Sequence, residues 1–242
     1  MTIGSSKILL HTITEMLGLF VGFRYYVYLK RKQGDVIHSS KRLWIVIGAT
    51  FGAFVGSRLV GGFENPLALF QSKNILLYFY YNKTIVGGLL GGLAGVELIK
   101  KIINEKRSSG DLFTFPIILA LIIGRIGCFS MGIYEETYGL PTSLPWGMNL
   151  GDNIKRHPVC LYEIAFLVLM WIFLKKLSKK FTFKNGSLFI IFMISYLFFR
   201  FMLDFIKPHH TLTIGLSIIQ VVCLAGLVYY YRYILHPKKL IQ

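Results

Sequence analysis

Charged residues are scarce in this chain of 242 residues. Only 16% of the residues are charged, whereas 54% are hydrophobic, and the mean hydropathy is +0.58. Soluble domains carry about 25% charged residues. The composition therefore excludes an ordinary soluble domain and predicts a membrane protein with several apolar spans.

Acidic residues are the scarcest of the charged types. The chain has 11 Asp and Glu against 27 Lys and Arg, a net charge of +16. The basic surplus is concentrated in loops 30–42, 100–111 and 175–186 and in the C-terminal tail, while loop 132–157 contains acidic residues. By the positive-inside rule the basic loops are cytoplasmic. The charge thus indicates topology and contact with anionic lipid, and it argues against nucleic acid as a partner.

Cysteine is scarce too, with three residues at positions 128, 160 and 223. Their positions follow no framework spacing, so we expect no structural disulfide. Cys128, His157 and Cys160 form a weak pattern for a soft metal site, because no fourth ligand is evident. We therefore expect neither a metal nor a cofactor.

Long apolar runs are abundant, and seven of them are predicted to span a membrane as helices. They are roughly 8–29, 43–61, 84–99, 112–131, 158–174, 187–206 and 212–231. Together with the basic loops they predict an all-α integral membrane protein with its N-terminus outside and its C-terminus in the cytoplasm. We expect residues 1–242 to form a single polytopic domain with an outer loop at about 132–157.

Two of these runs carry glycines at a spacing of four. Such ladders let two helix backbones approach closely within lipid. The glycines are Gly48, Gly52 and Gly56 in the second run and Gly87, Gly91 and Gly95 in the third.

Charged residues within the apolar runs require an explanation, because burying them in hydrocarbon is costly. At about 1.5 Å per residue, five of them fall near one layer in the outer half of the bilayer. These are Glu15, Arg58, Arg125, Glu163 and Arg200. Five charges at one depth indicate a shared site.

Helical spacing also places some of these residues on common faces. Tyr196 and Arg200 are four residues apart, and Arg125 shares a face with Cys128. For Arg58, pairing with a carboxylate is an equally good interpretation, and Arg200 has a second candidate partner in Asp204. Guanidinium groups bind phosphate in a bidentate manner. Arg125 and Arg200 together predict a site for the phosphate of a lipid headgroup.

Several motifs carry a resemblance to a known family. "GRIGCFSMG" is followed by "YG" at 138–139, "RHPVCLYE" at 156–163 and "SYLFFRFMLDFIKP" at 195–208. "VGSRL" and "KTIVGGLLGG" precede them in the order that the family has. The sequence resembles the prolipoprotein diacylglyceryl transferases of bacteria, which are seven-helix proteins of the cytoplasmic membrane.

The resemblance implies a reaction and its partners. A diacylglyceryl group passes from phosphatidylglycerol to the lipobox cysteine thiol in the signal peptide of a prolipoprotein. A thioether forms and glycerol phosphate is released. The nucleophile belongs to the substrate, so the enzyme needs no catalytic cysteine.

The resemblance also implies roles for single residues. Arg125 and Arg200 match the two essential arginines, and Glu163 is expected to be buried beside an arginine or the His157 ring. Residues that match substrate-binding positions are Arg58, Gly127, Cys128, Glu136, Gly139, His157, Tyr162, Glu163 and Tyr196.

The chain departs from the family pattern at a few positions. Cys128 stands where the signature has Asn, Val86 where a His precedes paired glycines, and Cys160 where a Gln is usual. We expect Cys128 to be a packing substitution. The absent histidine removes a candidate base or phosphate donor.

Two alternatives to this function stay open at this point. The first keeps the fold and the lipid donor but uses another acceptor. The second is a transporter or channel, against which the single depth of the charges and the absence of an inverted repeat both argue.

Overall fold

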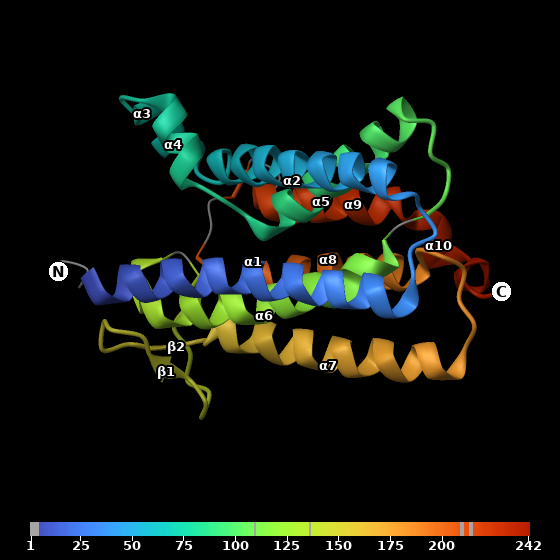
Figure 1. The fold of residues 1–242 in the computed structure, drawn as a ribbon. Helices are drawn as coiled ribbons and strands as arrows, with labels where there is room; N and C mark the ends of the chain where they lie inside the picture. Colours follow the sequence, from blue (N-terminus) through green and yellow to red (C-terminus); the bar gives the residue numbers. More distant parts are fainter. Residues whose placement is uncertain (1–4, 109, 136, 209–210, 213–214) are drawn as a thin grey trace.

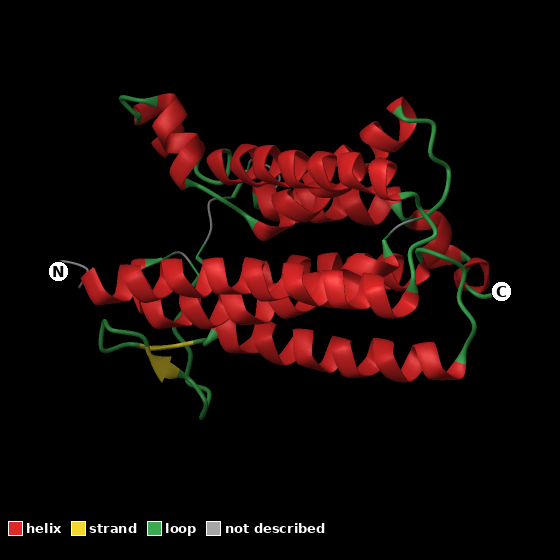
Figure 2. Cartoon of the chain, in the orientation of Figure 1, coloured by secondary structure: helices red, strands yellow, loops and turns green. Residues whose placement is uncertain are grey.

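The computed structural model describes residues 5–108, 110–135, 137–208, 211–212 and 215–242. This part of the chain is mostly helical, with one small two-stranded hairpin (Figure 2). Its helices of twelve or more residues are α1 (Ser5–Gln33), α2 (Ser39–Gly62), α5 (Ile85–Ile102), α6 (Asp111–Met131), α7 (Val159–Lys180), α8 (Ser187–Asp204) and α9 (Ile218–Tyr229). Each of the seven predicted apolar runs overlaps one of these helices.

Within the described residues, four helices are long and apolar enough to cross a membrane. They are Ser6–Gln33, Ser39–Gly62, Asp111–Tyr134 and Ser187–Asp204, and Ile218–Tyr229 is a shorter apolar helix. Many large apolar side chains face outward, including Leu19 at 67% and Phe51 at 70% exposure. The chain is therefore an all-α membrane protein.

The helices form two groups (Figure 1). One contains α2, α5 and α9, and the other contains α1, α6, α7 and α8. Contacts between α8 and α9 join the two groups. The face of α8 that carries Phe192, Met193, Tyr196 and Leu197 is fully buried. Helix α8 is thus the central element of the core.

The two glycine ladders pack α2 against α5, as predicted. A Cβ atom on Gly56 would lie 2.5 Å from the Gly87 carbonyl oxygen, and one on Gly52 would collide with the Gly91 carbonyl oxygen. Only glycine permits such an approach of two helix backbones.

The last apolar run is shorter as a helix than the predicted 212–231. Helix α9 begins at Ile218 because Ser217 and Gln220 form a capping box. The Ser217 hydroxyl accepts from the Gln220 N–H at 3.0 Å, and Gln220 Oε1 accepts from the Ser217 N–H at 2.9 Å. After α9 the chain continues through α10 (Tyr231–Leu235) and the 3₁₀ turn η2 (Pro237–Leu240).

The connection between α2 and α5 contains two short helices that the sequence prediction missed. Helix α3 (Pro66–Gln71) is capped by Asn65, and α4 (Ile75–Tyr81) is capped by Asn74. The pair projects from the helix groups at the upper left of Figure 1.

The loop at 132–157 is largely structured by local hydrogen bonds. It contains the 3₁₀ turn η1 (Gly132–Tyr134) and strands β1 (Met148–Asn149) and β2 (Lys155–Arg156), which pair antiparallel. Partial burial opposes ionisation of Asp152, but a hydrogen bond from Arg156 at 2.7 Å holds the pKa of Asp152 below its usual value. The Leu140 N–H donates to the Ile206 carbonyl at 2.8 Å, which ties this loop to the end of α8.

Candidate active site

The carboxylate of Glu163 lies between two arginines in the centre of the second helix group. Its Oε2 atom is 2.9 Å from Arg125 Nε on α6 and 3.2 Å from Arg200 Nη1 on α8. Its Oε1 atom accepts a hydrogen bond from the Tyr196 hydroxyl at 2.7 Å. The expected burial of Glu163 beside an arginine is confirmed. Three helices meet at this one carboxylate.

The charges of this cluster do not balance. Two guanidinium groups face one carboxylate, which leaves a formal charge of +1 among Arg125, Glu163 and Arg200. Arg125 is 6% exposed, Arg200 4% and Glu163 1%, so water screens the surplus only weakly. Within the described residues the Nε atom of Arg200 is buried without a hydrogen-bond partner. The cluster is therefore suited to an anion that accepts from guanidinium groups.

The second partner considered for Arg200, Asp204, is held elsewhere. Its carboxylate accepts a short hydrogen bond from the Ser217 hydroxyl in the segment before α9. The ion pair of Arg200 is the one with Glu163. Asp204 instead joins α8 to the start of α9.

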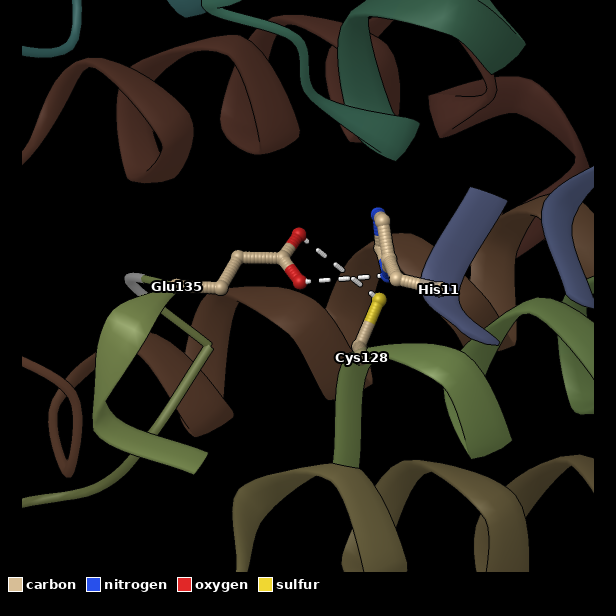
Figure 3. A group of neighbouring side chains, drawn as sticks. All are labelled: His11, Cys128 and Glu135. Carbon is tan, nitrogen blue, oxygen red and sulfur yellow. Dashed lines mark hydrogen bonds and ion pairs between the residues drawn. The ribbon is translucent and has the colours of Figure 1, made fainter. Parts of the chain in front are cut away.

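A chain of polar side chains extends from Arg125 toward the N-terminal end of α1. Arg125 Nη1 lies 3.6 Å from Cys128 Sγ, which lies 3.8 Å from Glu135 Oε1. Glu135 Oε2 is 3.5 Å from His11 Nδ1, and His11 Nε2 is 3.5 Å from Glu15 Oε1. Figure 3 shows the side chains of His11, Cys128 and Glu135 converging. Cys128 is buried, and the expectation that it is a packing substitution stays a prediction.

His157 and Tyr162 form a separate cluster at the start of α7. His157 Nδ1 is 3.1 Å from the Tyr162 hydroxyl, which accepts from Trp146 Nε1 at 2.8 Å. The Gly139 N–H donates to the His157 carbonyl at 3.1 Å, and a Cβ on Gly139 would lie 2.5 Å from His157 Cβ. Gly139 thus positions the loop that carries His157.

Arg58 stands apart from the two site arginines. Its guanidinium lies over the rings of Phe54 and Tyr80, at 4.9 and 5.4 Å from their centroids. No ion pair joins Arg58 to a carboxylate in the part of the chain that the structure describes. The pairing with a carboxylate that was considered as one of two interpretations is therefore not observed, and cation–π contacts take its place.

Two further predicted residues have simple outcomes. Gly127 leaves room for the Thr14 side chain of α1, since any Cβ there would collide with the Thr14 hydroxyl. Glu136 lies outside the described residues.

All three cysteines are free and buried, as expected. Cys128, His157 and Cys160 do not form a ligand cluster among the described residues.

His11 and Glu135 were not among the predicted site residues. His11 and Glu15 are spaced as neighbours on one helical face, which was a usable signal. Glu135 is adjacent to the Glu136 that was selected. Its approach to Cys128 depends on how the turn η1 folds back over α6, which the spacing does not predict.

A buried cluster with a surplus of positive charge, in a helical membrane protein, is typical of a site that binds an anionic group. Comparison with known families makes the assignment specific. The family model for prolipoprotein diacylglyceryl transferase matches residues 1–235. The chain belongs to this family, and it is a transferase.

Similar proteins support the assignment, and each is named phosphatidylglycerol–prolipoprotein diacylglyceryl transferase. A protein of Finegoldia magna is 30% identical over 237 residues, which cover 90% of this chain and 86% of the relative. A protein of Cupriavidus metallidurans is 30% identical over 210 residues, and the match covers 77% of this chain and 73% of the relative. A protein of Cupriavidus necator is 35% identical over 171 residues, and the match covers 67% of this chain and 59% of the relative.

Proposed function

We propose that this protein transfers a diacylglyceryl group from phosphatidylglycerol to the lipobox cysteine of a prolipoprotein signal peptide. The reaction forms a thioether and releases glycerol phosphate. The names of the relatives support both the lipid donor and the acceptor. All the organisms of the relatives are bacteria, which supports a location in the bacterial cytoplasmic membrane.

The observation that carries this proposal is the sharing of Glu163 by Arg125 and Arg200. The unbalanced positive charge suits the phosphate of phosphatidylglycerol in the ground state. When the carbon–oxygen bond breaks, the leaving phosphate gains a second negative charge. Donors fixed at that position stabilise the transition state more than the ground state. Arg125 and Arg200 are accordingly the proposed catalytic residues.

The remaining residues of the site have positioning or binding roles in this proposal. Glu163 and Tyr196 hold the two guanidinium groups in place. His157, Tyr162 and Gly139 form the wall that the outer loop contributes near the site. Arg58, Gly127, Cys128 and Glu136 complete the proposed substrate-binding set.

We further propose that the chain is a single domain with seven spans, its N-terminus outside and its C-terminus in the cytoplasm. Helices α5 and α7 are included as spans although they carry Glu97 and Glu163 and end in lysines. The basic loops support this orientation. It places loop 132–157 outside, where a secreted precursor arrives.

The experiment that tests this function is transfer in vitro from labelled phosphatidylglycerol to a lipobox peptide. A peptide with Ser in place of the lipobox Cys is the control. We expect label in the Cys peptide alone, stable to thioester-cleaving hydroxylamine. Release of label from the lipid without transfer to this peptide would favour another acceptor, and an unconsumed donor would contradict the proposal.

A further inference from the structure

His11, Cys128 and Glu135 bring three metal-binding groups together beside the arginine cluster. The ligand atoms of the three side chains all lie within 4.8 Å of one another. They come from α1, from α6 and from the residue after η1, so tertiary packing assembles the group (Figure 3). We propose that they bind a Zn²⁺ ion, in contrast to the expectation of no metal from the sequence.

The separations of the ligand groups are close to those of a tetrahedral zinc site, with His11 and Cys128 each near a different oxygen of Glu135. Zinc lies about 2.0 Å from nitrogen and oxygen ligands and about 2.3 Å from sulfur, so neighbouring ligand atoms are about 3.3–3.6 Å apart. His11 Nδ1 is 3.5 Å from Glu135 Oε2, and Cys128 Sγ is 3.8 Å from Glu135 Oε1. A thiolate, an imidazole and a carboxylate are together a set that zinc accepts readily.

Two of the ligand atoms are buried and form no hydrogen bond, although they lie 3.5 Å from one another. They are His11 Nδ1 and Glu135 Oε2, for which the described residues provide no hydrogen-bond partner. Buried polar atoms of this kind are rare because desolvation is not compensated. A cation between the two atoms satisfies both at once.

The groups behind the ligands also have the arrangement of a metal site. Metal-bound histidines commonly pair their other ring nitrogen with a carboxylate. Here His11 Nε2 is 3.5 Å from Glu15, which is in turn held by Lys83 at 2.5 Å. Arg125 Nη1 lies 3.6 Å from Cys128 Sγ and is placed to donate to a thiolate. The three ligands with Zn²⁺ sum to zero charge, so they leave the positive surplus of the arginine cluster available for phosphate.

Three protein ligands leave the fourth position of the ion open, as in catalytic zinc sites. This second part of the inference rests on the proposed function. The fourth ligand is the sulfur of the acceptor cysteine, whose S–H proton passes to water on binding because zinc binds the thiolate. The sulfur then forms a bond to the terminal glyceryl carbon as the bond between that carbon and the phosphate oxygen breaks. The leaving glycerol phosphate keeps the electron pair.

Arg125 contacts both the proposed zinc site and the arginine cluster. Its Nη1 atom contacts Cys128 in the proposed zinc site, and its Nε atom faces Glu163 in the arginine cluster. A zinc-bound thiolate and a phosphate held by Arg125 would therefore be neighbours. The zinc ion would supply the thiol activation for which the family histidine at position 86 is absent.

The first test measures metal without activity. The full-length protein in detergent is stripped with a chelator, loaded with Zn²⁺ and analysed after gel filtration, with one ion per chain expected. Cobalt loading should give a thiolate-to-cobalt absorption band in the unsubstituted protein and in Cys223→Ser, but not in Cys128→Ser. A band that persists in Cys128→Ser, or a chain that retains no zinc, would overturn the site.

A second measurement uses only the unsubstituted protein, so it does not depend on whether the variants fold. X-ray absorption of the zinc-loaded, unsubstituted protein should show one sulfur at about 2.3 Å and nitrogen or oxygen ligands at about 2.0 Å. A spectrum without sulfur contradicts the assignment. Glu15→Gln should weaken zinc affinity by about 10- to 100-fold, while Glu97→Gln, at an exposed position of α5, should leave it nearly unchanged. Equal effects of the two would show that Glu15 does not act through His11.

The second test addresses the acceptor. A lipobox peptide should intensify the cobalt band through a second thiolate, and a peptide with Ser in place of Cys should not. An unchanged band would contradict the acceptor role. Full transfer by chelator-stripped protein would also contradict it while leaving the proposed function intact. A zinc-loaded protein that transfers nothing from phosphatidylglycerol would refute the proposed function. It would not contradict the metal site.

Discussion

At the scale of single residues, Glu163 holds two guanidinium groups that have little access to water. Removing one member of a buried charge set typically costs about 3–5 kcal/mol, because the remaining charges lose their partner. Glutamine at this position retains an acceptor for the Tyr196 hydroxyl but not the negative charge. In the proposed function, Glu163 positions the arginines and takes no part in the chemistry.

Glu163→Gln should consequently lower the thermal midpoint and reduce kcat by roughly tenfold, which corresponds to about 1.4 kcal/mol in the barrier. The measurement is transfer rate and thermal unfolding in detergent, with Glu97→Gln as the matched control because Glu97 is exposed on α5. Inactivation as complete as that of an arginine variant would instead indicate that Glu163 takes part in the chemistry.

Much of the arginine cluster could be predicted from the sequence. Arg125, Glu163 and Arg200 could be placed at one depth because helical rise is constant and the spans are clear. Which arginine pairs with which acid could not be predicted. The partner of Asp204 proved to be Ser217, and Arg58 lies over aromatic rings, because side-chain pairing depends on helix rotation.

At the scale of elements, α2 and α5 pack closely along their glycines, and glycine is required along this contact. A methyl group on Gly91 would collide with the Gly52 carbonyl oxygen. Gly91→Ala should therefore lower the thermal midpoint, although alanine favours helix by up to about 1 kcal/mol. Thermal unfolding in detergent is the measurement.

Gly124→Ala is the control for this prediction. A Cβ at Gly124 meets no atom within 4 Å, so only the gain in helix propensity remains. The thermal midpoint should be unchanged or raised. Equal destabilisation by the two variants would show that backbone contact is not what the glycine at position 91 provides.

The elements themselves could be predicted more reliably than their ends. All seven helical runs are visible in the hydropathy, but α9 begins six residues later than predicted (218 against 212). The pattern S-x-x-Q at 217–220 marks that start. The predicted start was placed earlier because it followed the apolar residues before this pattern. Helix α3 also has a local signal, since Asn65 precedes Pro66.

At the scale of the whole molecule, the orientation determines which side of the membrane supplies the acceptor. The proposed topology places residue 152 outside and residue 106 in the cytoplasm. Asp152→Cys should react with a membrane-impermeant maleimide on intact cells or spheroplasts, whereas Lys106→Cys should react only after permeabilisation. The native cysteines are buried and give a low background. Labelling of position 152 from the cytoplasm alone would refute the orientation.

The decisive measurement is the transfer rate of Arg125→Ala, Arg125→Lys and Arg200→Ala with phosphatidylglycerol and a lipobox peptide in proteoliposomes. Each variant loses a donor that is stronger in the transition state, at a cost of about 3 kcal/mol or roughly a hundredfold in rate. Lysine keeps the charge but not the planar fork, so Arg125→Lys should stay impaired. Arg24→Ala, at an exposed position of α1, is the control. Folded variants with a hundredfold loss are the predicted result, and folded variants with near-normal transfer would contradict the phosphate role of both arginines.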